Sequence, residues 1–301
     1  MNITVTGATG FIGAQLVEKL LGAGHTVHAL ARKRPSTLPT PVQFSEWDST
    51  QGEPPPESLA TADAVVHLAG EPVAQRWTAE AKQRIRASRV DGTRHLVTAL
   101  STQSRRPQVL VSASAIGIYG SRGDEILTEH SDAGDDFLAR VVAGWEKSAE
   151  LAESLGIRVV RLRFGLVLGN GGALAKMLPP FRLGAGGRIG SGKQWMSWIH
   201  IDDLTNMILF ALKNAVARGP MNATAQNPVT NAEFTKALAA TLHRPAIFPV
   251  PKFALSLMLG EMSTVVLASQ RVLPLAAQSA GFQFEYPQLK AALARLLSEG
   301  T

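Results

Sequence analysis

The 301-residue sequence predicts an α/β protein, a doubly wound parallel sheet with a smaller C-terminal substrate lobe. Three observations lead to this fold class. Short β-branched runs alternate with longer helical patterns through the first half of the chain, which is typical of parallel strands joined by crossover helices. The first strand runs directly into a loop with three glycines and then a helix. Apolar residues make up 45% of the chain, which is enough to bury a core.

Six strands and three helices are expected in the first half. Runs of alternating or continuous apolar residues predict the strands, and longer periodic segments predict the helices. The strands are expected at residues 3–6, 26–31, 42–45, 64–68, 108–112 and 158–163. The helices are expected at residues 11–23, 78–101 and 136–154, and a break near Asp91–Gly92 in the second of them is left open.

The character of the sequence changes after Gly165. Glycine-rich loops follow at residues 169–172 and 184–192, with Pro179–Pro180 between them. We therefore divide the chain into a sheet domain at residues 1–165 and a smaller lobe with a C-terminal extension at residues 166–301. Within that second part we expect a strand near residues 220–223 to return to the sheet and helices at residues 202–213, 231–243, 253–259 and 288–298.

Composition argues against several classes of protein. The chain has no cysteine, and its histidines and carboxylates lack metal-ligand spacing, so no metal site is expected. The net charge of +6 contains no run of five like charges, contiguous basic face or aromatic platform, so we expect no nucleic-acid partner. The longest stretch without acidic or basic residues, 1–17, has no basic start and contains three glycines. We therefore expect no membrane span and a cytoplasmic location.

The glycine loop predicts a dinucleotide site. Gly7 permits a tight turn after the first strand, Gly10 lets a pyrophosphate approach the backbone, and Gly13 lets the following helix pack closely on the strand. The phosphates would then accept the free N–H groups at the start of the helix. This arrangement predicts a Rossmann-type fold; the alternative is a glycine-bearing turn in an ordinary α/β protein.

The end of the second expected strand indicates which dinucleotide is bound. A carboxylate there usually binds the ribose hydroxyls of NAD, and an arginine accommodates a 2′-phosphate. This chain reads H-A-L-A-R-K-R at residues 28–34. Arg32 is the expected phosphate ligand, assisted by Lys33 or Arg34, which favours NADP(H). The alternative is a solvated basic turn.

Several motifs together resemble the extended short-chain dehydrogenase/reductase family. T-G-A-T-G-F-I-G at residues 6–13 is similar to its cofactor loop, V-V-H-L-A-G at 65–70 to its fourth-strand motif, V-D-G-T at 90–93 to its helix motif and W-I-H-I-D-D-L at 198–204 to a late motif. The sequence S-A-S-A-I-G-I-Y-G at 112–120, A-G-W-E at 143–146, residues 176–192 and residues 260–274 resemble one atypical branch, the epimerase-family group with a characteristic C-terminal extension. This resemblance covers the whole chain and implies NADP(H) binding without naming a substrate.

The resemblance implies further cofactor-binding residues. Within the glycine loop these are Thr9, Phe11 and Ile12. Asp48 matches the acidic residue that contacts adenine, and Leu68, Ala69 and Gly70 match the stretch beside the ribose and nicotinamide. Gly165, Leu166 and Val167, with Leu168, match the loop near the nicotinamide amide. Each also has a structural alternative: Asp48 as a turn residue, Leu68–Ala69 as core, and Gly165 as the end of a strand.

The usual catalytic residues of the family are only partly present. Ser114 matches its Ser/Thr position at the end of the fifth strand, but aligning Glu146 puts Val142 and Leu138 at the positions of its lysine and tyrosine. Tyr286 and Lys290 have the Tyr-x-x-x-Lys spacing, at the far C-terminus. We interpret that pair as a coincidence of composition. Pro287 is then expected to be the first residue of the terminal helix.

Few groups remain for acid–base chemistry. Tyr119 is the aromatic hydroxyl in range of Ser114, and we expect the two to be catalytic; a packed tyrosine with a satisfied hydroxyl is an equal alternative. His200 and Asp202 suggest a pair, but we interpret Asp202 as a helix cap and His200 as the end of a strand. Arg76, Lys82, Arg84, Arg86 and Arg89 form a basic helix, which is solvated by default, although some could reach cofactor phosphates or an anionic substrate.

We therefore expect an NADP(H)-dependent oxidoreductase or epimerase-like enzyme that acts on a small polar or sugar-like molecule. Its substrate pocket is expected under the loop at residues 176–198, which carries Trp195 and Trp198. The alternative is a non-catalytic NADP(H) sensor that binds a protein partner. A homodimer is compatible with either function.

Overall fold

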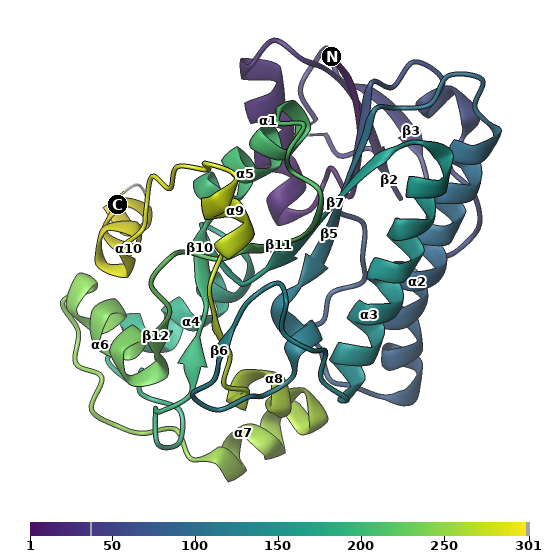
Figure 1. Ribbon diagram of the computed structural model, residues 1–301. Helices are drawn as coiled ribbons and strands as arrows, with labels where there is room; N and C mark the ends of the chain where they lie inside the picture. The colour runs from purple at the N-terminus through teal and green to yellow at the C-terminus, as the bar shows by residue number, and fades with distance from the viewer. Residues whose placement is uncertain (37, 299–301) are drawn as a thin grey trace.

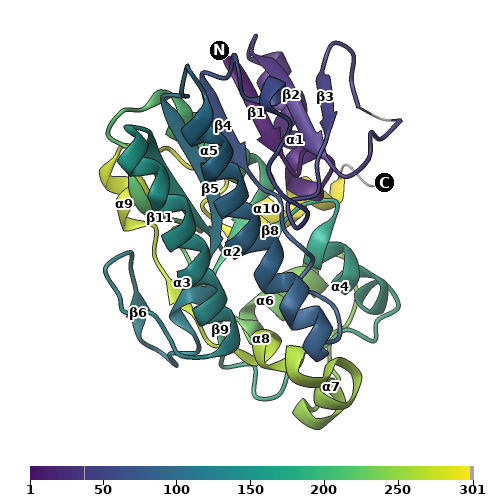
Figure 2. The same ribbon diagram turned by 90° about the vertical axis from the view of Figure 1, so that its right-hand side faces the viewer.

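The computed structural model describes residues 1–36 and 38–298. Its centre is a seven-stranded sheet in the order β11-β7-β5-β4-β1-β2-β3, and every neighbouring pair is parallel. Helices α2 and α3 lie side by side on one face, and α1 and α5 cover the other (Figures 1 and 2). The Rossmann-type doubly wound sheet is confirmed.

The strands follow the expected pattern closely. They are β1 (Asn2–Thr6), β2 (Thr26–Ala31), β3 (Gln43–Glu46), β4 (Ala64–His67), β5 (Val109–Ala115) and β7 (Arg158–Phe164). Strand β5 ends three residues later than predicted, so Ser114 lies within it and not beyond it. The expected returning strand is β11 (Gly219–Ala223), which pairs with β7 at the edge of the sheet.

The helices of the first half are also close to their expected ranges. They are α1 (Phe11–Gly22), α2 (Ala79–Thr102) and α3 (Phe137–Glu150), the last followed by a 3₁₀ turn at Leu151–Leu155. Helix α2 continues without a break through Asp91–Gly92. Glycine is needed there for space, because a Cβ on Gly92 would lie 2.7 Å from Cβ of Ser49.

Three helices of the second half were not predicted from the sequence: α4 (Gly172–Arg182) and the short helices α8 (Ser263–Leu267) and α9 (Leu275–Ser279). Helix α4 includes Pro179 and Pro180, where a loop was expected. Each proline removes the hydrogen bond that its own N–H would have made, and its ring crowds the carbonyl group four residues earlier. Burial of Leu174 and Phe181 against the core outweighs that loss.

The remaining helices and short strands complete the fold, and the division of the chain into two lobes stays a prediction. The helices are α5 (Ile201–Lys213), α6 (Asn231–Thr241), α7 (Lys252–Leu259), α8 (Ser263–Leu267), α9 (Leu275–Ser279) and α10 (Leu289–Ser298). The short strands pair as β8 (Leu166–Leu168) with β10 (Trp198–His200), β9 (Trp195–Met196) with β12 (Val229–Thr230), and β6 (Ile126–Leu127) with β13 (Arg271–Val272). Among the described residues no helix is long and apolar enough to span a membrane.

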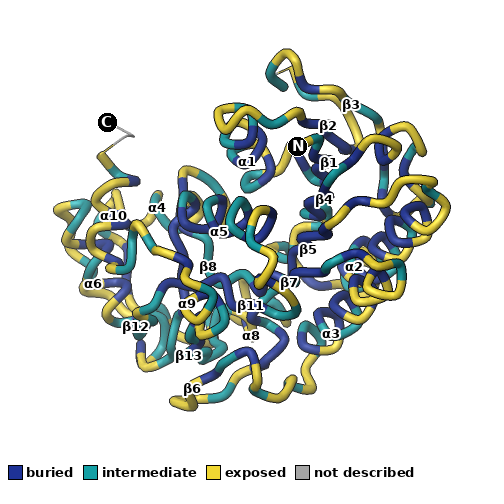
Figure 3. The backbone as a smooth tube through the Cα atoms, turned by 45° about the horizontal axis from the view of Figure 1, so that its top comes forward, coloured by how far each residue is buried: buried dark blue, intermediate teal, exposed yellow. Residues whose placement is uncertain are grey.

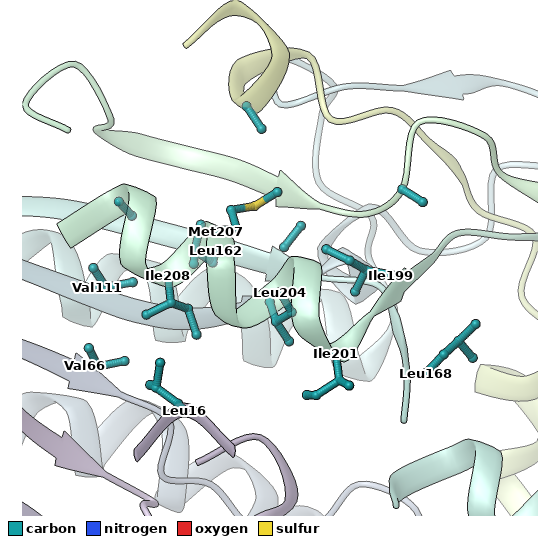
Figure 4. Close-up of a cluster of buried hydrophobic side chains, with 14 of the residues drawn as sticks. Leu16, Val66, Val111, Leu162, Leu168, Ile199, Ile201, Leu204, Met207 and Ile208 are labelled. Atoms are coloured by element: carbon teal, nitrogen blue, oxygen red, sulfur yellow. The ribbon is translucent and has the colours of Figure 1, made fainter. Parts of the chain in front are cut away.

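One hydrophobic core joins the sheet to the helices and short strands that follow it in the chain (Figures 3 and 4). Side chains from α1, the sheet, β8, β10 and α5 meet in it, including Leu16, Val66, Val111, Leu162, Leu168, Ile199, Leu204 and Ile208. Trp198 is fully buried in the same core. It therefore packs inside the protein, contrary to its expected place over a substrate pocket. Trp195 instead lies against Arg271, whose guanidinium carbon is 4.3 Å from the ring centroid.

Candidate functional site

A cavity of about 820 Å³ lies at the carboxyl ends of β1, β2 and β4. It is lined by eight of the residues predicted to bind a cofactor: Gly7, Thr9, Gly10, Arg32, Asp48, Leu68, Ala69 and Gly70. In an open parallel sheet, ligands bind outside the carboxyl ends of the strands, at the point where the strand order reverses. Here the order reverses at β1, whose neighbours are β4 and β2. The sequence motifs and the cavity therefore coincide.

The glycine loop has the tight geometry that the sequence predicts. Gly7 has φ +66°, and a Cβ there would lie 2.8 Å from the carbonyl carbon of Leu68. A Cβ on Gly13 would lie 2.2 Å from the carbonyl oxygen of Gly7. Helix α1 begins at Phe11, and no side chain caps the N–H groups of its first turn. The loop thus leaves backbone and helix amides available to a phosphate, which fits a dinucleotide.

A buried network fixes the chain beside this loop. The amides of Leu68 and Ala69 both donate to Thr6 Oγ1, at 3.1 Å each. Thr6 Oγ1 also lies 2.7 Å from His67 Nδ1, and His67 Nε2 lies 3.0 Å from Thr93 Oγ1. Because Thr6 Oγ1 already accepts two hydrogen bonds, we assign its hydroxyl proton to a hydrogen bond donated to His67 Nδ1. The ring proton of His67 then lies on Nε2 and is donated to Thr93 Oγ1. Burial lowers the pKa of His67 to about 4, so the ring is neutral near pH 7.

The basic turn after β2 lies at one end of the cavity. Arg32 is exposed and lines the cavity, and no carboxylate follows the strand directly. Arg34 lies over the ring of Phe44, with its guanidinium carbon 5.8 Å from the ring centroid. Asp48 also lines the cavity, while its Oδ1 accepts from the amide and hydroxyl of Thr50. Asp48 is therefore both a turn residue and a wall of the site.

Other predicted cofactor residues lie outside the cavity lining. Phe11 packs against Gly169 and Gly171, so closely that a Cβ on either glycine would lie 2.6 Å from its ring. The expected loop after Gly165 contains β8, whose residues Leu166 and Val167 pair with β10. Ile12 is packed against the core, as are Leu166 and Val167. A cofactor role for these residues stays a prediction.

Ser114 and Tyr119 belong to one buried polar network. Ser114 Oγ donates to Glu146 Oε1 at 2.6 Å, and Arg163 pairs with both oxygens of that carboxylate at 2.7 and 2.9 Å. Arg163 Nη1 also donates to the Tyr119 hydroxyl at 2.9 Å, and that hydroxyl donates to Asn222 Oδ1 at 2.7 Å. Ser114 is 2% exposed and Tyr119 0% exposed. Neither lines the described cavity.

Burial raises the pKa of Tyr119, although the Arg163 guanidinium acts in the opposite direction. Its phenol is therefore neutral near pH 7. The packed tyrosine with a satisfied hydroxyl, the alternative raised from the sequence, describes the surroundings that the structure shows. The catalytic roles of Ser114 and Tyr119 stay predictions.

The positions of the missing catalytic pair are apolar. Leu138 and Val142 on α3 pack in hydrophobic clusters. The Tyr286 ring stacks on His200, with ring centroids 4.0 Å apart, while Lys290 is exposed on α10. Neither Tyr286 nor Lys290 lines the cavity.

Two expectations about helix starts were wrong. Helix α10 begins at Leu289, two residues after Pro287, so this proline precedes the helix. His200, and not Asp202, is the N-cap of α5; its Nδ1 accepts from the Asp202 amide at 3.1 Å. Asp202 is occupied elsewhere, because its Oδ1 accepts from Gln15 at 2.9 Å. Imidazole is not among the preferred N-cap side chains, whereas aspartate is, so the sequence favoured Asp202.

One face of α2 lines the cavity, and the sequence indicated it only through Arg84, one of the basic residues that could reach cofactor phosphates. The residues of this helix that line the cavity are Glu80, Gln83, Arg84, Ala87 and Ser88. Their spacing of three and four residues places them on one side of a helix, a signal that the sequence contained. Among the described residues no group of acidic or histidine side chains could hold a metal ion.

Comparisons with known proteins agree with this geometry. A sequence model of the NAD dependent epimerase/dehydratase family matches residues 3–223, and a model of a domain of unknown function matches residues 250–296. The epimerase family protein YfhF of Bacillus subtilis (strain 168) is 43% identical over 300 residues, 99% of both chains. The Arabidopsis thaliana protein named epimerase family protein SDR39U1 homolog, chloroplastic, is also 43% identical, over 99% of this chain and 87% of its own length.

Solved structures show the same likeness. The human epimerase family protein SDR39U1 (isoform 2), crystallised with NADPH, is 34% identical and has a TM-score of 0.90 over 99% of both chains. The UDP-glucuronic acid 4-epimerase of Bacillus cereus, solved with UDP-glucuronic acid and NAD, has a TM-score of 0.80 over the full length of both chains. Its identity of 18% makes it a likeness of fold alone.

Proposed function

This chain belongs to the NAD dependent epimerase/dehydratase family, and we propose that it binds NADP(H) and acts as an oxidoreductase or epimerase-like enzyme on a small polar or sugar-like molecule. The observation that carries the cofactor choice is Arg32, which lines the cavity directly after β2 where an NAD-specific protein usually has a carboxylate. The relative crystallised with NADPH supports the same choice. The cytoplasmic location and the homodimer stay predictions from the sequence.

The residues present fit the cofactor in a defined direction. The pyrophosphate would accept the free N–H groups at the start of α1, and Arg32 would hold the 2′-phosphate. The 2′-phosphate belongs to the adenosine half of the cofactor, which would then lie over β2 and β3. The nicotinamide half would extend over β4, towards Gly70. When bound, the nicotinamide supplies hydride transfer.

If the protein is an enzyme that reduces a carbonyl group, one of its own side chains must also donate a proton to the substrate oxygen. We propose that Ser114 orients the substrate oxygen and that Tyr119 donates from its neutral phenol, which suits carbonyl reduction near pH 7. The Tyr119 hydroxyl would first have to release Asn222, its present acceptor. Binding of the substrate therefore has to open the network around Arg163.

A second candidate function is NADP(H) binding without turnover, coupled to a protein partner. The burial of Ser114 and Tyr119 favours it, since both hydroxyls already have partners within the protein. Leu138 and Val142, at the positions of the usual catalytic pair, favour it as well.

A turnover screen separates the two. We would incubate the protein and NADPH with aldehydes, ketones, keto sugars and nucleoside-diphosphate sugars, following absorbance at 340 nm for reduction and chromatography for epimerisation. The enzyme proposal predicts turnover of at least one class, lowered about 10²–10⁴-fold by Tyr119→Phe with NADPH affinity retained. Tight NADPH binding without turnover would support the second candidate. Full turnover by both Tyr119→Phe and Ser114→Ala would reject their proposed roles.

A further inference from the structure

Several large apolar side chains are exposed on a part of the molecule that the proposed function does not use. Each of them is between 69 and 83% exposed: Leu183, Ile247, Phe248, Phe253, Leu257 and Met258. None of them lines the cavity. A single exposed apolar residue is ordinary in a folded protein, but a group of them on one surface marks a place that contacts a partner or a membrane.

These side chains come from two segments that lie side by side. Ile189 and Val250 form a parallel β-bridge, and a Cβ on Gly184 would lie 3.4 Å from Cγ of Pro245. The turn after α4, which carries Leu183, is thereby held beside the segment that leads into α7. The exposed apolar side chains therefore share one surface, which we call the apolar surface.

Helix α7 is the outermost part of the apolar surface. It has no buried residue, and it lies at the lower edge of the molecule in both ribbon views (Figures 1 and 2). Phe253 and Leu257 are one helical turn apart, so they lie on the same side of the helix, and Met258 is the next residue. Apolar side chains on an outlying helix suit insertion into a deformable apolar layer, since a protein partner would need a groove shaped to receive them.

The apolar surface is also positively charged. No aspartate or glutamate occurs at residues 154–201 or 234–260, which include both segments. Among the described residues, the exposed cations next to the apolar side chains form no ion pair with a carboxylate: Arg182, Arg188, Arg244 and Lys252. A second copy of the chain would bring the same charges against these, so a symmetric dimer through this surface is disfavoured.

We propose that the apolar surface docks on a lipid bilayer that contains anionic lipids. Phe253, Leu257 and Met258 enter the boundary between headgroups and acyl chains, while the neighbouring cations attract the anionic headgroups. A peripheral contact of this kind needs no membrane-spanning helix, and the described residues contain none. The proposal does not depend on the bound cofactor or on turnover.

The first test is cosedimentation with vesicles of phosphatidylcholine alone and with vesicles of an equal mixture of phosphatidylcholine and phosphatidylglycerol. The wild type should bind the mixed vesicles and not the neutral ones, and added salt should weaken the binding by screening the charges. Replacing Phe253→Ser together with Leu257→Ser should weaken binding by about 10- to 100-fold, because less apolar surface leaves water. Arg182→Gln and Arg244→Gln should each weaken it about fivefold.

A matched control lies in the loop between α5 and β11, where Val216 and Arg218 are also an exposed apolar residue and an exposed cation. The variant with Val216→Ser and Arg218→Gln should bind the mixed vesicles as the wild type does. All variants change exposed side chains, so their circular dichroism spectra should match that of the wild type.

The absence of cysteine permits a second measurement. Met258→Cys and Val216→Cys would each carry one nitrobenzoxadiazole label, whose emission shifts to shorter wavelength when it leaves water. Mixed vesicles should produce this shift for the label at position 258 and none for the label at position 216. Neutral vesicles should change neither.

Failure of the wild type to bind either kind of vesicle would overturn the proposal. A dimer in analytical ultracentrifugation that the Phe253→Ser, Leu257→Ser variant lacks would then identify a second copy as the occupant. Vesicle binding that every variant retains in full, or a label at position 258 that stays in water when the protein is bound, would place the contact elsewhere and overturn the proposal too. None of these outcomes affects the proposed function.

Discussion

Glu146 and Arg163 form a bidentate ion pair inside the protein, with Nε 2.7 Å from Oε1 and Nη2 2.9 Å from Oε2. Both residues are buried, and Ser114 donates to the same carboxylate. The pair joins α3 to β7, and through Ser114 it also holds the end of β5. In the sequence, Glu146 served only to locate the position of the family's missing lysine. In the structure, its carboxylate accepts hydrogen bonds from both Ser114 and Arg163.

Removing Glu146 should therefore destabilise the protein strongly. We expect Glu146→Ala to lower the free energy of unfolding by about 3–5 kcal/mol, because it leaves the Arg163 charge buried without a partner. The control is Lys147→Ala on the same helix, an exposed side chain whose removal is expected to change the free energy of unfolding by no more than about 0.5 kcal/mol. Urea unfolding measures both. Equal losses in the two variants would show that the buried pair has no special role.

His67 should make stability depend on pH. The pKa of His67 is about 4 in the folded protein and 6.5 in an unfolded chain, so between these pH values the unfolded chain binds a proton that the folded protein does not. Its contribution is complete above pH 6.5 and is lost as the pH falls to 4, on the order of 3 kcal/mol in total.

The measurement is urea unfolding between pH 4 and 7 for the wild type and His67→Gln, whose amide can both accept and donate. As the pH decreases, the free energy of unfolding should fall more steeply for the wild type than for His67→Gln, which lacks the buried imidazole. The carboxylates are the same in both proteins, so their contribution cancels in the comparison. The control, His130→Gln at an exposed site, should follow the wild type. Parallel curves for wild type and His67→Gln would refute the assignment.

Tyr286 and Lys290 should be dispensable for cofactor binding. Tyr286→Phe keeps the ring that stacks on His200, and Lys290→Ala changes an exposed side chain outside the cavity lining. Both variants are expected to bind NADPH with the affinity of the wild type in a fluorescence titration. A large loss in either variant, with an unchanged circular dichroism spectrum, would mean that this Tyr-x-x-x-Lys sequence is functional.

The sequence predicted the glycine loop of the site, because that loop is formed by residues close together in the chain. Gly7 and Gly10 lie in one short segment with the strand before them and the helix after them, so their place in the cavity followed from spacing. The partners of Ser114 did not follow, because Glu146 and Arg163 lie 32 and 49 residues away and meet it only through the packing of α3 and β7. Helix α4 was missed for a related reason: burial of Leu174 and Phe181 outweighs the local preference of two prolines.

The choice between NADP(H) and NAD(H) tests the account most directly. A charged contact from Arg32 to the 2′-phosphate contributes about 1.5–3 kcal/mol, so calorimetry should show NADPH binding about 10- to 100-fold more tightly than NADH. Arg32→Ala should remove most of that difference, whereas Arg94→Ala, at an exposed site that pairs with Asp91, should preserve it. Equal affinities of the wild type for NADPH and NADH would contradict the account.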